Sequence, residues 1–264
     1  MTIKRKWVSV WGNAVSVAEN RPERYAKDIT IRYPINIPFA GEALRLTFDN
    51  YCGTEAITLS KITVFYGGEF YPVLVNGERS ATIPAREKVV TDPLELKLNE
   101  GELIQVSFYL ADFTLMRSVV FSCGPLSEGL YANGDQTENA AIDIVTSRRT
   151  QLFYFLSNVS ILTDGGNRTI VCYGDSITAQ DWPDFLAMRC FREGIIRPPS
   201  SAGPPAAPAS CGSTTASLTS PTACRGRTAL PTRCPPMERT PSSFSRASTI
   251  SFTPWGSRST SFAP

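Results

Sequence analysis

The sequence predicts an N-terminal all-β sandwich, jelly-roll-like in its many short strands, followed by the beginning of an α/β domain. Three observations predict this fold class. Apolar residues alternate with polar ones as far as about residue 165, the pattern changes to strand, loop and helix over 166–196, and the composition changes again over 197–264. We therefore divide the chain into a β-sandwich domain (1–165), the first strand-loop-helix unit of an α/β domain (166–196) and an irregular tail rich in Pro, Ser and Arg (197–264).

The sandwich is predicted from short segments in which every second residue is apolar, a period typical of half-buried strands. The clearest are 44–48, 62–66, 94–98 and 104–110, of which 62–66 is apolar on both faces. Residues that favour tight turns separate them, namely Gly67-Gly68, Asn76-Gly77, Asn99-Glu100-Gly101 and Asp164-Gly165-Gly166. Many short strands with such turns between them favour a sandwich.

The second region begins with the short apolar run Thr169-Ile170-Val171-Cys172, which is typical of a strand buried in a parallel sheet. Asp181 is predicted to cap a helix, with Asp184 as its reciprocal capping partner. Gly194 is a plausible end of that helix. Helical spacing places four residues on one apolar face: Trp182, Phe185, Leu186 and Cys190.

The connection between this strand and this helix reads Tyr173-Gly174-Asp175-Ser176-Ile177-Thr178. A serine hydroxyl is a useful nucleophile near neutral pH only when a base, usually histidine, takes its proton. The chain contains no histidine. Ser176 is therefore either part of an ordinary Gly-Asp-Ser turn or a nucleophile whose base this polypeptide lacks, and we favour the nucleophile. Asp175 either supports the loop or simply forms the turn.

The block Gly174-Asp175-Ser176-Ile177 resembles the first conserved block of the SGNH/GDSL hydrolase (esterase) superfamily. Thr178 and the helical segment 182–187 are similar to bacterial members that carry an N-terminal β-sandwich. Such members share two further features, an R-x-x-x-x-N-x-x-G segment and a D-P step before a strand, which here are Arg45, Asn50, Gly53 and Asp92-Pro93. The resemblance covers residues 7 to about 194.

The resemblance implies a three-layer, flavodoxin-like α/β domain that hydrolyses small esters by acyl transfer, without metal or cofactor. Ser176 would be the nucleophile and its backbone N–H one oxyanion-hole donor. Acylated carbohydrate is the substrate class we expect first, and lysophospholipid-type esters second. The family's two later donor residues and its D-x-x-H base are absent from this sequence, so we expect the chain as written to be inactive. The alternative is a non-catalytic sandwich that binds carbohydrate or a partner.

The tail from Arg197 onward contains a single acid, Glu238, and no lysine, which is unusual for a disordered segment. A second interpretation is translation in the wrong frame. Shifted one base upstream, residues 239–256 can be encoded to read A-D-T-I-I-I-Q-Q-G-I-N-D-I-I-H-P-V-G, an apolar strand followed by a G-x-N-D loop. Residues 199–222 can likewise be encoded to contain A-A-S-G. We favour this hypothesis, with a frame break near Ile195 and an end before the base could appear.

Charge and cysteine usage exclude several other classes of function. Lys plus Arg number 26 and Asp plus Glu 24, which gives no reason to expect nucleic acid or an anionic membrane as a partner. We find no apolar stretch long enough for a signal peptide or a membrane span and therefore expect a cytoplasmic protein. Seven cysteines without a C-x-x-C pair argue against a zinc site and favour reduced thiols. The oligomeric state is left open.

Overall fold

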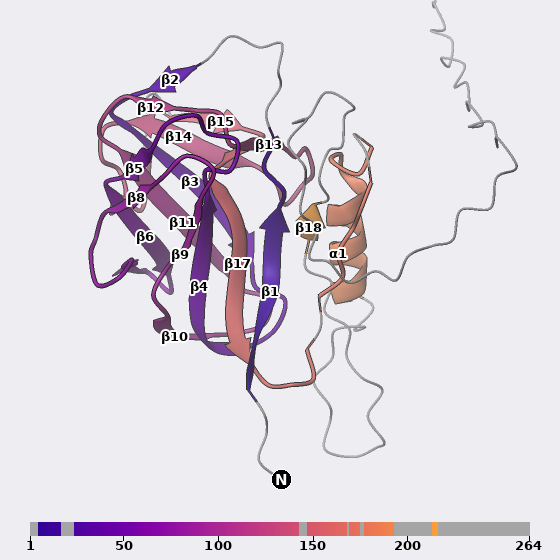
Figure 1. Ribbon diagram of the computed structural model, residues 1–264. Coiled ribbons are helices and arrows are strands. Elements are labelled where there is room, and N and C mark those ends of the chain that lie inside the picture. Colours follow the sequence, from indigo (N-terminus) through magenta and orange to yellow (C-terminus); the bar gives the residue numbers. More distant parts are fainter. Residues whose placement is uncertain are drawn as a thin grey trace, which may run out of the picture. The chain divides into compact units, whose positions relative to one another are not determined.

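The computed structural model describes residues 5–16, 24–142, 147–167, 169–174, 177–192 and 213–215. The N-terminal part is built from β-strands in two six-stranded sheets (Figure 1). In the first sheet the strand order is β10-β4-β17-β1-β18, and β9 pairs with β4. Its strands are β10 (Leu94–Leu98), β4 (Gly41–Asp49), β17 (Leu156–Thr163), β1 (Lys6–Asn13), β18 (Ser213–Thr215) and β9 (Lys88–Val90).

The second sheet has the strand order β15-β14-β3-β11-β6-β7. Its strands are β15 (Ser147–Thr150), β14 (Gly129–Asn133), β3 (Ile29–Asn36), β11 (Leu103–Leu110), β6 (Lys61–Tyr66) and β7 (Glu69–Pro72). Three short pairs complete the described strands: β2 (Tyr25–Ala26) with β12 (Thr114–Leu115), β13 (Val119–Phe121) with β16 (Leu152–Tyr154), and β5 (Ile57–Leu59) with β8 (Ala81–Ile83). Helix α1 (Trp182–Arg192) follows the sandwich.

Aromatic side chains fill the space between the two sheets. Phe48 of β4 meets Phe108 of β11 edge to face, with ring centroids 5.5 Å apart. Tyr33 of β3 is fully buried, and its hydroxyl donates to the carbonyl of Leu152 at 3.0 Å while it accepts from the N–H of Tyr154 at 2.7 Å. Burial raises the pKa of Tyr33, so the phenol stays protonated. These contacts confirm a β-rich N-terminal region with one shared core.

The four predicted strand segments are confirmed, since they lie within β4, β6, β10 and β11. In β4 the side chains of Leu44, Leu46 and Phe48 are buried, as the period-two alternation predicts. The predicted Asn76-Gly77 turn is also present, with positive φ angles of 52° and 83°. The carboxylate of Asp92 accepts hydrogen bonds from both N–H groups of this turn, at 3.2 and 2.7 Å.

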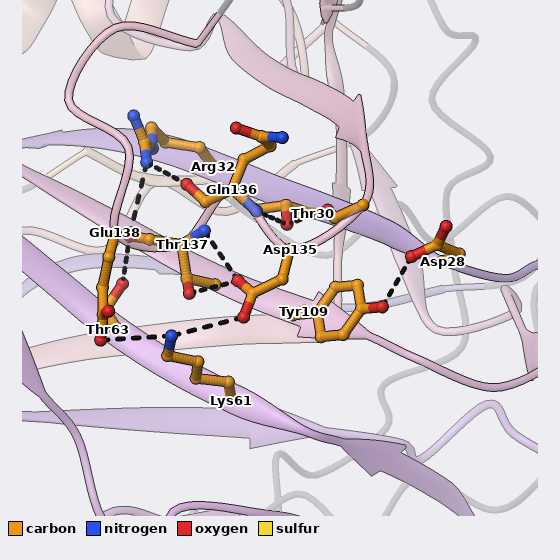
Figure 2. A network of polar contacts seen from close by, with 11 residues as sticks. Asp28, Thr30, Arg32, Lys61, Thr63, Tyr109, Asp135, Gln136, Thr137 and Glu138 are labelled. Carbon is orange, nitrogen blue, oxygen red and sulfur yellow. Dashed lines mark hydrogen bonds and ion pairs between the residues drawn. The ribbon is translucent and has the colours of Figure 1, made fainter.

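A polar network on the outer face of the second sheet was not predicted (Figure 2). Arg32 of β3 is 3% exposed, and its Nε donates to the hydroxyl of Ser107 at 2.7 Å. Its Nη2 donates to the carbonyl of Gln136 at 2.9 Å, and the hydroxyl of Thr63 donates to the carbonyl of Thr137 at 2.9 Å. Thr63 and Ser107 are buried because the 134–139 loop covers this face of the sheet.

The structure corrects the strand predicted at 169–173 and departs from the predicted irregular tail at three described residues. Residues 169–173 form no strand, since Val171 makes a single β-bridge and is 66% exposed. A buried parallel strand needs neighbours on both sides, and the described residues provide none here. The tail, predicted to be irregular, contains β18, whose short Ser-Thr-Thr run pairs in parallel with the outer edge of β1. The rest of the tail, and Gly194, lie outside the described residues.

Candidate functional site

The candidate site is the Gly174–Thr178 block, which joins the end of the sandwich to helix α1. The predicted nucleophile Ser176 and its supporting acid Asp175 lie outside the described residues, whereas Gly174, Ile177 and Thr178 are described. A Cβ atom added to Gly174 would lie 2.1 Å from the hydroxyl oxygen of Thr178. The two ends of the block are therefore in contact, and the close approach requires glycine at position 174.

The block leads directly into the N-terminus of α1. The N–H of Gln180 donates to the carbonyl of Ile177 at 3.2 Å and closes a turn. The N–H of Phe185 donates to the carbonyl of Asp181 at 3.1 Å, which is the first bond of the helix and makes Asp181 the N-cap residue, as predicted. The positive end of the helix dipole consequently lies just after the block.

Asp184 fastens the start of α1 to the sandwich. Its Oδ2 accepts hydrogen bonds from the N–H of Leu126 and the hydroxyl of Ser127, both at 2.9 Å. The side chain is buried, and burial raises its pKa, partly opposed by these two hydrogen bonds. A Cβ atom on Gly124 would lie 2.0 Å from the same carboxylate oxygen, so Gly124 makes room for it. Instead of the predicted reciprocal capping role, the carboxylate binds the turn formed by residues 122–127, here called the docking turn.

Two further hydrogen bonds tie this region to the sandwich. The N–H of Cys123, in the docking turn, donates to the carbonyl of Ala179 at 3.3 Å. The hydroxyl of Thr169 donates to the carbonyl of Ser9 in β1 at 2.7 Å. The Gly-Pro step in the docking turn is a turn signal, but nothing in the sequence indicates that Asp184 reaches it.

The buried face of α1 differs from the predicted one. The buried residues are Pro183, Asp184, Ala187 and Cys190, while Leu186 is half-buried. Trp182 and Phe185, predicted to be buried, are 40% and 54% exposed. Asp184 binds the docking turn. Because residues three apart lie on the same face of a helix, Ala187 faces the sandwich as well. The exposed large apolar side chains of this region are Val171, Tyr173, Ile177, Trp182, Phe185, Met188 and Phe191.

A mostly apolar groove of about 480 Å³ runs between the sandwich and α1. Val10, Trp11 and Ile37 line it on the sandwich side, and Phe185 and Phe191 on the helix side. None of the described residues of the Gly174–Thr178 block lines it. The groove is therefore separate from the described part of the candidate nucleophile block.

The residues of the R-x-x-x-x-N-x-x-G segment have structural roles. The guanidinium of Arg45 lies 4.5 Å from the centre of the Trp7 ring. Asn50 is fully buried, and its amide donates to the carbonyls of Glu55, Ile83 and Pro84 at 2.9, 3.2 and 3.2 Å. A Cβ atom on Gly53 would lie 2.0 Å from the Asn50 side-chain oxygen, so this position requires glycine. Through Asn50, this segment is hydrogen-bonded to residue 55 and to residues 83 and 84.

Acidic residues of the 134–139 loop are engaged in ion pairs with a lysine. Lys61 Nζ lies 3.3 Å from Asp135 and 3.2 Å from Glu138 (Figure 2). Asp135 also accepts hydrogen bonds from Thr137, and these bonds together with Lys61 lower its pKa against the effect of burial. Within the described part of the chain no cluster of His, Cys, Asp or Glu could hold a metal ion.

Comparison with models of known protein families gives no match to this chain, and no curated protein sequence matches it. Among the described residues no helix is both long and apolar enough to cross a membrane. The candidate site therefore stands on its own residues and on the resemblance of the Gly174–Thr178 block to the SGNH/GDSL pattern.

Proposed function

We propose that this chain carries the nucleophile block of a serine ester hydrolase of the SGNH/GDSL kind, with Ser176 as nucleophile and backbone oxyanion donor. One observation carries the proposal: the ends of the block, Gly174 and Thr178, touch, and the block is followed at once by the capped N-terminus of a docked helix. A helix N-terminus stabilises nearby negative charge. Such charge develops on the carbonyl oxygen when a serine attacks an ester.

The proposed reaction is acyl transfer from a small ester, acylated carbohydrate first. The Ser176 oxygen attacks the ester carbonyl, the alcohol leaves with a proton supplied by the base, and water then hydrolyses the acyl-serine. Removing the base from such a site leaves roughly 10³–10⁴-fold acceleration over water from the remaining donors and binding. Because this polypeptide has no histidine and lacks two of the expected donors as well, we expect negligible turnover.

We propose further that residues 166–196 open a three-layer α/β domain whose later strands are encoded in the alternative frame. The apolar side chains of Val171 and Phe185, 66% and 54% exposed, are what an α/β unit without its neighbouring strands leaves uncovered. Residues 239–256 can be encoded so that the shifted frame reads as an apolar strand and a G-x-N-D loop of the kind that would follow.

The experiment that tests this proposal is to resequence the coding DNA around codons 190–200 and to assay both polypeptides with p-nitrophenyl acetate. We expect a read-through frame that encodes an Asp and a His downstream, and a protein whose turnover is lost in Ser176→Ala. The present chain should hydrolyse p-nitrophenyl acetate no faster than its own Ser176→Ala variant. A read-through frame without such a pair would refute the hydrolase proposal. If the present chain hydrolyses the ester and Ser176→Ala abolishes this turnover, the prediction that the chain is inactive is refuted.

A non-catalytic sandwich that binds carbohydrate or a partner is the second candidate. Two observations favour it: the chain has no histidine, and the main core draws all its buried members from residues 8–161. The sandwich therefore has the core of a module that could act alone. Glycan binding by residues 1–165, measured on a glycan array and by calorimetry, would support this candidate. Its absence, together with an Asp and His in the read-through frame, would exclude it.

A further inference from the structure

We infer that Asp184 is a positioning residue, through which the docking turn of the sandwich holds the segment that carries the candidate nucleophile. The inference rests on the proposed function of Ser176 and adds a role for the sandwich within the same site. It follows from three features of the described residues: the buried carboxylate and its two donors, the glycine that makes room for it, and a second bond at Ala179.

The seat of Asp184 is specific for an acceptor oxygen. A buried carboxylate is costly unless hydrogen bonds satisfy it, and Oδ2 accepts one from the backbone of Leu126 and one from the hydroxyl of Ser127. Ser127 itself accepts a hydrogen bond from the hydroxyl of Ser122 at 3.1 Å, and its N–H donates to the carbonyl of Gly124 at 3.0 Å. The docking turn is thus held by hydrogen bonds of its own as well as by those to α1. An apolar side chain at position 184 would leave two buried donors without a partner.

The second bond brings this anchorage close to Ser176. Ala179 is buried, and its carbonyl accepts from Cys123 of the same docking turn. Thr178, the preceding residue, is buried and contacts Gly174 at the other end of the block. The docking turn therefore binds the chain on the C-terminal side of the block at two points, Ala179 and Asp184. Releasing Asp184 should loosen the block as well as the helix.

The test is amide hydrogen exchange of the full chain, read by mass spectrometry in peptides covering 173–179, 182–192 and strand β11. We expect Asp184→Ala to speed exchange of the first two by about tenfold or more, since two hydrogen bonds to a buried acceptor are lost, and to leave β11 unchanged. Asp184→Asn keeps an acceptor oxygen, so its exchange should be no faster than that of the wild type. Gly124→Ala should reproduce the effect of Asp184→Ala, because its Cβ occupies the place of the carboxylate.

Met188→Ala is the matched control. Met188 belongs to the same helix, is 43% exposed and lines the apolar groove without hydrogen-bonding the docking turn, so its substitution should leave all three peptides unchanged. Unchanged exchange of 173–179 in Asp184→Ala would overturn the inference, as would an Asp184→Asn variant as open as Asp184→Ala. If the exchange rate of the β11 peptide rises equally, Asp184 contributes to the global stability of the protein, and a positioning role is also refuted. None of these outcomes involves ester chemistry, so the inference can fail independently of the proposed function.

Discussion

At the scale of single residues, the side chain of Asn50 joins segments distant in sequence by hydrogen bonds to backbone carbonyls. Asn50 is fully buried, and its side-chain amide donates to the carbonyls of Glu55, Ile83 and Pro84. Gly53 is required because its hydrogen leaves space for the Asn50 oxygen. The R-x-x-x-x-N-x-x-G pattern is therefore explained by folding and needs no contact with substrate.

We predict that Asn50→Ala lowers the free energy of unfolding by about 2–3 kcal/mol, because the side-chain hydrogen bonds to the carbonyls of Glu55, Ile83 and Pro84 are lost from a buried position. Urea denaturation followed by tryptophan fluorescence measures this change. Asn139→Ala, at an exposed position with local hydrogen bonds, should stay within about 0.5 kcal/mol of wild type. Equal effects of the two substitutions would contradict a structural role for Asn50.

At the scale of elements, the strands were predictable and the docking of the helix was not. Period-two alternation located β4, β6, β10 and β11 because one face of each strand packs on the shared core. The polar face of the second sheet was missed because burial of Thr63 and Ser107 depends on a loop distant in sequence.

Helix α1 was found from its period, but its buried face was assigned from hydrophobicity alone. The helix instead buries Asp184, while Trp182 and Phe185 remain 40% and 54% exposed. A buried carboxylate can be predicted only when its donors are known, and these come from the docking turn about 57 residues earlier in the chain. Ser176 itself could be proposed from the sequence because its pattern is local.

The docking of α1 should depend on pH with a definite sign. Burial raises the pKa of Asp184 above its ordinary value of 3.8, so the folded state holds the proton more tightly than the unfolded state. This group therefore contributes most stability below its unfolded pKa. That contribution falls as the pH rises through the window up to the raised folded pKa and is constant above it.

We predict that Asp184→Asn removes this loss. The docking of α1 in the variant should therefore become more stable, relative to wild type, as the pH rises from about 3.5 to neutral. Hydrogen exchange of the 182–192 peptide, corrected for the intrinsic pH dependence of exchange, measures the difference at each pH. Because both proteins share every other carboxylate, their difference isolates Asp184. A difference that shrinks with rising pH would show that the docking turn stabilises the ionised carboxylate and lowers its pKa, contrary to this prediction.

At the scale of the whole molecule, the described residues contain two hydrophobic clusters of unequal size. The main core takes its buried members from Val8 to Ile161 and includes both sheets. In the second, small cluster, Ala187 and Cys190 are buried against Leu126, Ile170 and Leu186. The sandwich should therefore fold without residues that follow it, whereas the region around α1 depends on the docking turn.

We predict that a polypeptide of residues 1–166 unfolds cooperatively, with a Tm within about 5 °C of the full chain. It keeps every buried member of the main core and loses, among the described residues, the segment around α1 and the short edge strand β18. Differential scanning calorimetry measures this. In the full chain, trypsin should cleave after Arg189 and Arg192 well before it cuts after Arg32 in β3, since the α1 segment packs through a small cluster and exposes Phe185 and Phe191. Loss of the cooperative transition in 1–166, or equal resistance of both regions to trypsin, would mean that α1 and the sandwich form one folding unit.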